Sequence, residues 1–132
     1  VVLSDSLKWL APEERAKQRD DFLEQIENWR ARWSARDSEG YLAYYAADFE
    51  TDGMNKRAFS EHKRRVNAGK SFIEVTLTDV DLFRYPDGKP LMLARFTQQY
   101  RSDNYRKSTR KEQYWRREAD GRWRIVKEVS NS

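Results

Sequence analysis

The spacing of apolar residues changes near residue 72, and this change constrains the fold more than any other feature of the chain. Before it, apolar residues recur every three or four positions, as they do on one face of a helix. From Phe72 onward they alternate with polar residues, as in strands that bury one face. This order predicts an α+β domain with segregated helices and sheet.

Three helices are predicted in the first half of the chain. The first begins at Pro12, because proline suits a first turn and the acids that follow it suit the positive end of the helix dipole. Its apolar face comprises Phe22, Ile26, Trp29 and Trp33. Asp37 is predicted to cap a second helix, whose apolar residues are Tyr41, Leu42, Tyr44, Tyr45 and Phe49. The third spans residues 55–68 and stops at Gly69.

Four long strands are predicted after residue 72, in a strongly curved antiparallel meander covered on one side by the helices. The turns between them are Pro86-Asp87-Gly88, Ser102-Asp103-Asn104 and Asp120-Gly121. The apolar phase of the first strand shifts by one at Thr78-Asp79, which predicts a β-bulge. A curved sheet closed by helices tends to enclose a pocket, the default place to look for function.

The composition supports one folded domain. A chain of 132 residues predicts a single core, and we expect residues 1–11 to be a linker or lead-in and residues 12–132 to be the domain. Five Trp, seven Tyr and six Phe supply the apolar surface that disordered chains lack. No apolar run is long enough to span a bilayer, and no signal peptide is recognised. The lack of Cys excludes disulfides, thiolate metal sites and cysteine nucleophiles in this chain.

Several sequence phrases resemble those of the nuclear-transport-factor-2-like domain at the C-terminus of bacterial L,D-transpeptidase-type proteins. The phrases are Trp29-x-x-x-Trp33, Tyr41-Leu42-x-x-Tyr45-x-x-x-Phe49, Phe96-Thr97-Gln98-Gln99-Tyr100-Arg101-Ser102, Lys111-x-x-Tyr114-Trp115 and Gly121-Arg122-Trp123-Arg124-Ile125-Val126-Lys127-Glu128. The resemblance covers roughly residues 15–130. It implies a cone-shaped α+β fold with a cavity between helices and sheet.

The resemblance also implies a context. In such proteins a separate upstream domain performs cysteine acyl transfer on peptidoglycan stem peptides, and this chain has no Cys. We therefore expect an accessory module of an enzyme of the periplasm or cell envelope. The start at Val1, without Met, resembles a linker from that enzyme.

Eight residues are candidates for lining a ligand pocket. They are Trp29, Trp33, Tyr45, Gln98, Tyr100, Lys111, Trp115 and Glu128. The aromatic members are either a ligand surface or simply core. A Lys111–Glu128 pair either binds the two ends of a zwitterionic ligand or is a structural ion pair, and both interpretations stay open. On the last strand, alternation predicts that Glu128 faces away from Ile125.

Charged residues offer weaker candidates. Residues 95–127 contain eleven Lys or Arg against four acids, so this stretch carries +7. Its charges either attract an anionic partner or are solvated strand residues. Nucleic acid is not the expected partner, because no RNA- or DNA-binding motif accompanies the aromatic residues. His62, the one histidine, has no predicted partners for catalysis or metal binding. We predict no catalytic residue, metal ligand or cofactor.

Three functional hypotheses follow. The first is a non-catalytic module that binds peptidoglycan or a stem peptide, or that positions the upstream catalytic domain. The second is a small stand-alone enzyme whose acid or base is Glu128, Tyr100 or His62. The third is a dimerisation module that pairs through the sheet.

Overall fold

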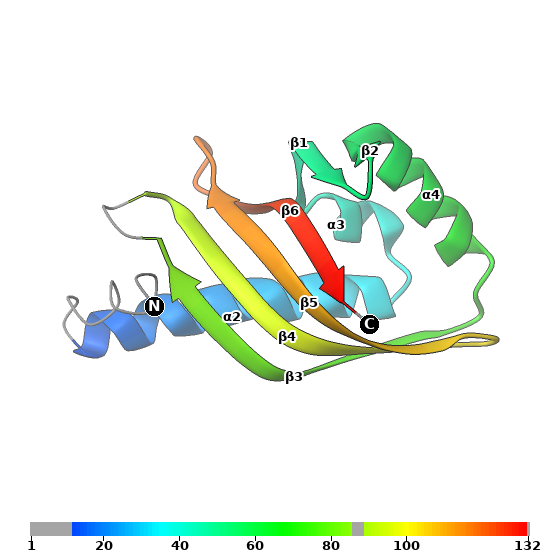
Figure 1. The fold of residues 1–132 in the computed structure, drawn as a ribbon, viewed down its shortest axis with the longest axis horizontal. Helices are drawn as coiled ribbons and strands as arrows, with labels where there is room; N and C mark the ends of the chain where they lie inside the picture. Colours follow the sequence, from blue (N-terminus) through cyan, green and yellow to red (C-terminus); the bar gives the residue numbers. More distant parts are fainter. Residues whose placement is uncertain (1–11, 86–88, 132) are drawn as a thin grey trace.

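The described residues form an α+β domain in which three helices cover a curved six-stranded sheet (Figure 1). The computed structural model describes residues 12–85 and 89–131, so the predicted lead-in and the turn at residues 86–88 lie outside the described residues. The helices are α2 (Pro12–Ser34), α3 (Ser38–Leu42) and α4 (Lys56–Ala68). The strands are β1 (Tyr45–Thr51), β2 (Met54–Asn55), β3 (Ile73–Arg84), β4 (Leu91–Ser102), β5 (Arg106–Arg117) and β6 (Trp123–Asn131).

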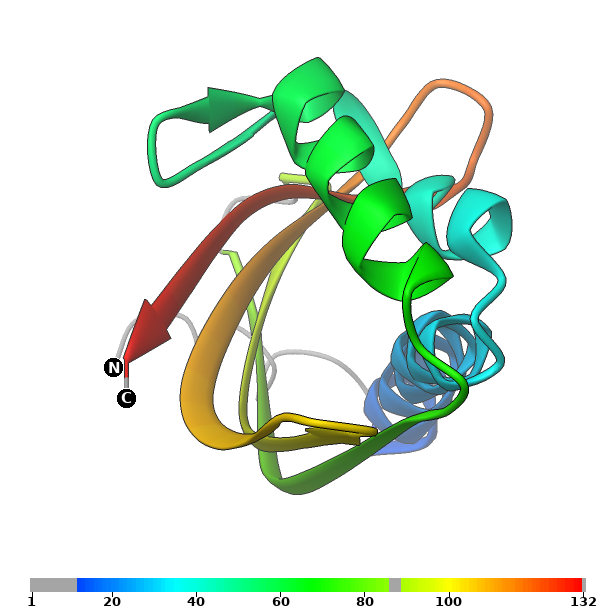
Figure 2. The same cartoon turned by 90° about the vertical axis from the view of Figure 1, so that its right-hand side faces the viewer.

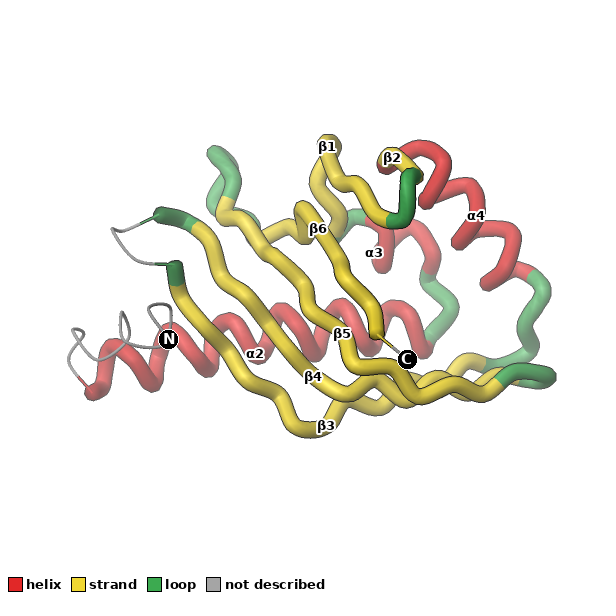
Figure 3. The backbone as a smooth tube through the Cα atoms, viewed as in Figure 1, coloured by secondary structure: helices red, strands yellow, loops and turns green. Residues whose placement is uncertain are grey.

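The sheet has the order β2-β1-β6-β5-β4-β3. Strands β3 to β6 form the predicted antiparallel meander, and β1 is added in parallel beside β6. The sheet curves around the helices, so its concave face and the helices enclose the core (Figures 2 and 3). Within the described residues, no helix is both long and apolar enough to cross a membrane.

The predicted start of the second helix and both predicted ends of the third helix are confirmed. The Asp37 carboxylate accepts a hydrogen bond from the Gly40 N–H, 3.0 Å away, and caps α3. Asn55 caps α4 in the same way through the N–H of Ala58, and Gly69 is the C-cap of α4. The four apolar residues predicted for the first helix are all buried along α2.

The second predicted helix is wrong beyond Leu42, because the chain continues as strand β1. Tyr45 and Phe49 are buried four residues apart, a spacing that is typical of a helix. In β1 the spacing has another cause. Tyr45 pairs with Ile125 and Glu50 pairs with Lys127, so five steps along β1 correspond to two along β6. This irregularity breaks the alternation that would have identified a strand.

Two further bulges orient the strands that line the interior. The predicted bulge in β3 is confirmed, since the register shifts between Thr78 and Asp81 and Asp79 has a φ of 53°. The prediction that Glu128 faces away from Ile125 is wrong. A register shift in the β5–β6 pairing makes Val126 an extra residue, so Ile125 and Glu128 are both buried.

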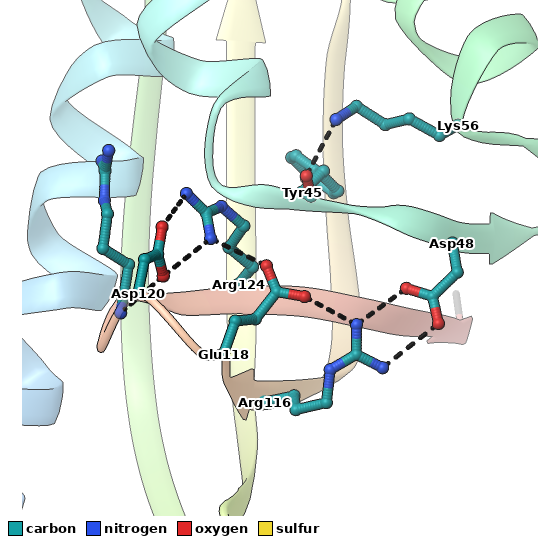
Figure 4. Close-up of polar contacts among 8 residues, drawn as sticks. Tyr45, Asp48, Lys56, Arg116, Glu118, Asp120 and Arg124 are labelled. Carbon is teal, nitrogen blue, oxygen red and sulfur yellow. Dashed lines mark hydrogen bonds and ion pairs between the residues drawn. The ribbon is translucent and has the colours of Figure 1, made fainter.

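Ion pairs occupy much of the basic segment on the surface (Figure 4). Arg116 of β5 pairs with Asp48 of β1 at 2.8 Å and with Glu118 at 2.7 Å. Arg124 of β6 pairs with Glu118 at 2.8 Å and with Asp120 at 2.9 Å. Such partly exposed pairs contribute little stability singly, but this chain of alternating charges links β1 to the β5–β6 hairpin. These arginines are therefore not a free anion-binding patch.

Candidate functional site

A cavity of about 500 Å³ lies between α4, the end of α2 and the inner faces of β4 and β5. Trp33 reaches it from α2, and His62, Lys63, Val66 and Asn67 reach it from α4. The strands and their connecting turn contribute Gln98, Tyr100, Asn104, Tyr105, Lys107, Thr109 and Lys111, and Lys70 lies in the loop after α4. No acidic side chain lines the cavity in the described part of the chain. Its wall is therefore aromatic and cationic.

Two lysine side chains from different elements enter the cavity beside one indole ring. The ammonium of Lys63 lies 4.9 Å from the centroid of Trp33, and that of Lys111 lies 5.5 Å from the same ring. Aromatic faces attract cations, which helps both ammonium groups to stay in a place poor in water. The two positive charges nevertheless repel each other.

One buried carboxylate sits beneath the lysines. The Lys111 Nζ is 3.8 Å from Glu128 Oε1, and both side chains are 7% exposed. Glu128 Oε2 accepts hydrogen bonds from the Gln113 amide at 2.6 Å and from the Tyr45 hydroxyl at 2.9 Å. Glu128 does not line the cavity, so these three contacts hold it as a structural anion under the cavity wall.

The network continues away from the cavity through neutral groups. The hydroxyl oxygens of Tyr41 and Tyr45 are 3.0 Å apart, and the Trp29 indole donates to Tyr45 at 3.2 Å. Burial, followed by the charge of Glu128, raises the pKa of both tyrosines well above the ordinary value. Both hydroxyls therefore keep their protons. Because Tyr45 has a single proton to give, Tyr41 donates to Tyr45 when Tyr45 donates to the carboxylate.

Several polar atoms of the cavity wall have no hydrogen-bond partner among the described residues. They are Trp33 Nε1, Gln98 Oε1, Tyr100 OH and Asn67 Oδ1. Trp33 is 3% exposed and Gln98 is 6% exposed, so an unmade hydrogen bond at either one is costly. Two of these atoms are donors or can donate, and two are acceptors only. These atoms have almost no accessible surface, so a ligand pairs with them only where the side chains turn toward the cavity.

The pKa of Lys63 is lowered to about 8, chiefly by burial and then by the positive charge of Lys111, while Glu128 acts in the opposite direction. Between pH 8 and lysine's ordinary pKa of 10.5, the unfolded chain holds a proton that the folded chain has released. The contribution of Lys63 to the free energy of unfolding therefore rises with pH across that window and is lowest below it.

We expect Lys63→Met to raise the free energy of unfolding at pH 7, because it removes a charge that folding desolvates. The gain over the wild type should shrink as the pH rises from 8 to 10.5. Urea unfolding of both proteins at pH 7 and pH 9.5 measures the difference. A gain that is equal at the two pH values would contradict the lowered pKa.

The structure brings four of the eight predicted pocket residues to the cavity: Trp33, Gln98, Tyr100 and Lys111. Three more, Trp29, Tyr45 and Glu128, are buried next to it in the hydrogen-bond network. Trp115 does not line the cavity, because it packs against Phe22 at 5.4 Å between ring centroids.

Two important residues were not predicted. Lys63 lies one turn after Phe59 on α4, and its burial depends on where that helix is placed in the fold. Gln113 lies on the buried face of β5 with Lys111 and Trp115. His62 lines the cavity and is exposed. Within residues 12–85 and 89–131, no three His, Cys, Asp or Glu side chains gather where they could hold a metal ion.

Comparison with known families explains the arrangement. Residues 21–129, which are most of the chain, match the family model of the Cds6 C-terminal NTF2-like domain. The chain belongs to this family. A helix-covered curved sheet around a cavity is what the predicted resemblance to NTF2-like domains implies, so the coarser part of that resemblance is confirmed.

Solved structures share the fold of this NTF2-like domain. Bd1075 of Bdellovibrio bacteriovorus superposes with a TM-score of 0.83 and 24% identity, over 92% of this chain and 44% of that one. A mutant of the helical cell shape determining protein Pgp2 of Campylobacter jejuni superposes with a TM-score of 0.71 and 19% identity. The match covers 79% of this chain and 37% of that one. An NTF2-like protein of unknown function from Pseudomonas putida KT2440 superposes with a TM-score of 0.73 and 20% identity. The match covers 89% of this chain and 87% of that one.

The NTF2-like domain thus spans less than half the length of Bd1075 and Pgp2. Comparison with curated proteins gives no significant match.

Proposed function

We propose that this NTF2-like domain is a non-catalytic ligand-binding module of a bacterial peptidoglycan-modifying enzyme, and that the cavity between α4 and the sheet is its ligand site. In this proposal a separate domain carries the catalytic cysteine of an L,D-transpeptidase-type enzyme. The NTF2-like domain contacts the substrate and positions it. The periplasm or cell envelope is the compartment that this role requires.

The observation that carries the proposal is the charge of the cavity wall. Lys63 and Lys111 bring two positive charges to one cavity, and Glu128 neutralises one of them. Burial and then the positive charge of Lys111 lower the pKa of Lys63, and an anionic ligand would offset both effects. Peptidoglycan stem peptides carry carboxylates and amides, and they suit a wall of lysines and unpaired hydrogen-bonding groups.

The comparisons support the cellular context. The domain covers 44% of Bd1075 and 37% of Pgp2, so in both proteins an NTF2-like domain is part of a longer chain. Pgp2 is described as determining helical cell shape, and the shape of a bacterial cell depends on its peptidoglycan wall.

The geometry removes one of the three candidates of the enzyme hypothesis, since Tyr100 and His62 line the cavity and Glu128 does not. An acid or base has to reach the substrate within hydrogen-bond distance. Glu128 is held by Lys111, Tyr45 and Gln113 and does not line the cavity. One solved structure with this fold is described as a putative dehydratase from Streptomyces avermitilis. Its 16% identity to this chain shows a shared fold alone.

Co-sedimentation with purified peptidoglycan sacculi at low and high salt tests the proposal. We expect wild-type protein to pellet at both salt concentrations, because partly buried charges are screened less than exposed ones. Lys63→Met should weaken binding by about tenfold. Lys127→Met removes the same charge from the exposed face of β6 and should bind as the wild type does.

Circular dichroism establishes that each variant is folded. Equal loss of binding in the two variants would mean that general charge, and not the cavity, attracts the sacculi. No pelleting of the wild type at either salt concentration would remove the proposed function. Self-association through the sheet is a separate prediction, which sedimentation velocity over a concentration series checks.

A further inference from the structure

We infer that the cavity recognises the C-terminal end of a peptide, with the terminal carboxylate between Lys63 and Lys111 and a preceding amide on Gln98 and Tyr100. This inference rests on the proposed function and names the part of the ligand that is bound. Four features of the described residues support it. They are the buried wall behind Lys111, the net charge beside that wall, the unpaired hydrogen-bonding atoms, and the order of these groups along the strands.

The cavity has a closed inner end. Lys111 is the innermost lining residue on β5, and behind it lie the buried side chains of Trp29, Tyr45 and Glu128. A ligand that reaches Lys111 meets this buried wall, whereas the middle of a polymer can cross only the open side of the cavity. A volume of about 500 Å³ falls within the range of small-ligand sites and suits roughly two or three amino-acid residues. The geometry therefore favours a chain end over the middle of a polymer.

The charge at the inner end matches one carboxylate. Two ammonium groups and the Glu128 carboxylate leave a net charge of +1, which a monoanion neutralises. The separation of 3.8 Å between Lys111 and Glu128 is long for a charged hydrogen bond, so the Lys111 ammonium has N–H groups available for a ligand.

The unpaired atoms above the lysines match a peptide group. Gln98 Oε1 is a pure acceptor and needs an N–H, whereas the hydroxyl of Tyr100 and the indole N–H of Trp33 donate to an oxygen. Each peptide group supplies one donor and one acceptor. A fatty acid also carries a carboxylate, but it would leave Gln98 Oε1 buried and unpaired.

The strand register places these groups in the order that an extended peptide requires. On neighbouring strands, Lys111 pairs with Phe96, Thr109 with Gln98 and Lys107 with Tyr100. Lys111 is buried and Lys107 is exposed, so this order runs from the inner end of the cavity to its mouth. Lys111 is therefore innermost. Gln98 and Tyr100, the groups that suit an amide, lie nearer the mouth by one and by two pairs of inward-facing residues. A peptide that enters with its carboxyl end first meets them in the matching order.

Small peptides of defined ends test the inference. The probes are N-acetyl-alanyl-alanine as the free acid and as its C-terminal amide, each in the L,L and D,D forms, together with decanoate. Binding is measured by NMR chemical-shift titration of the wild type, Lys63→Met, Gln98→Leu and the control Lys127→Met. Sacculi serve as a parallel arm.

We expect at least one of the free acids to bind about tenfold tighter than its amide, and Lys63→Met to abolish this preference. Gln98→Leu should weaken the binding of the free acid and of its C-terminal amide by a similar factor. It removes the contact to the internal peptide group and leaves the contact to the carboxylate. Lys127→Met should change neither affinity. Decanoate should bind more weakly than the preferred peptide acid.

Two results overturn the inference and leave the proposed function standing: amides that bind as well as acids, or sacculi that bind while no peptide does. Decanoate binding as tightly as the peptide acids would remove the amide part of the inference. Loss of both peptide and sacculus binding in the wild type would overturn the inference and the proposed function together.

Discussion

Lys111→Met should lower the free energy of unfolding by about 3–5 kcal/mol, the typical effect of breaking a buried ion pair from one side. The substitution leaves the Glu128 carboxylate buried without the cation that lies 3.8 Å from it. Methionine fills a similar volume, so the expected loss comes from the uncompensated charge and not from a cavity in the core. Urea unfolding followed by tryptophan fluorescence measures it.

The double variant Lys111→Met with Glu128→Gln is the matched control. It removes both charges and keeps an amide oxygen for the Tyr45 hydroxyl and the Gln113 amide, so it should be more stable than Lys111→Met alone. A double variant no more stable than the single one would show that packing of the lysine stem, not charge, accounts for the loss. In Lys111→Met the pKa of Lys63 should also rise, because the nearest repelling charge is gone.

Gln113→Leu should cost about 3 kcal/mol, although leucine has nearly the right size for the site. Gln113 is 0% exposed and has both ends of its amide engaged. It donates to Glu128 at 2.6 Å, and its oxygen accepts from the Trp115 indole at 3.1 Å. Leucine would leave a buried indole N–H unpaired and take one donor from a buried carboxylate, each of which costs about 1–3 kcal/mol.

Gln99→Leu on β4 offers a comparison, because Gln99 is exposed and the same chemical change there should stay within about 0.5 kcal/mol. Unfolding midpoints in urea, read with the slope of each transition, separate stability from changes in the unfolded state. If the two glutamine variants lose the same stability, the hydrogen bonds of Gln113 do not hold the core together.

Much of the fold could be predicted because local signals and tertiary contacts agree in most elements. Asn55 marks the start of α4 through a local side-chain hydrogen bond from the Ala58 N–H, and Gly69 follows the last residue of the helix. The bulge at Asp79 was visible as a shift in phase, since residues on both sides of it keep strict alternation.

The parts that were missed depend on pairing between distant segments. Tyr45 and Phe49 have helical spacing, and the strand they form exists because β6 lies beside it. The burial of both Ile125 and Glu128 likewise depends on a bulge whose partner is on β5. A single sequence contains no local signal for either event.

The same limit applies to the site. Aromatic phrases and the Lys111–Glu128 pair indicated a pocket wall, and four predicted residues line the cavity. Lys63 could not be placed there, because a lysine on a half-apolar helix is usually solvated and its burial depends on the position of α4 across the cavity from β5. Gln113 matters through two partners, and neither could be assigned before the strand register was known.

The place of β6 between β1 and β5 also determines how the domain acquires its structure during synthesis. Tyr45 and its partner Ile125 are separated by most of the domain, and closing so long a loop is entropically costly and slow. Until the ribosome has released residues 123–131, β1 and β5 both have unpaired edges and Lys111 lacks its carboxylate. The nascent domain therefore depends on its last strand for its native state, and a translational pause before that strand would prolong the aggregation-prone interval.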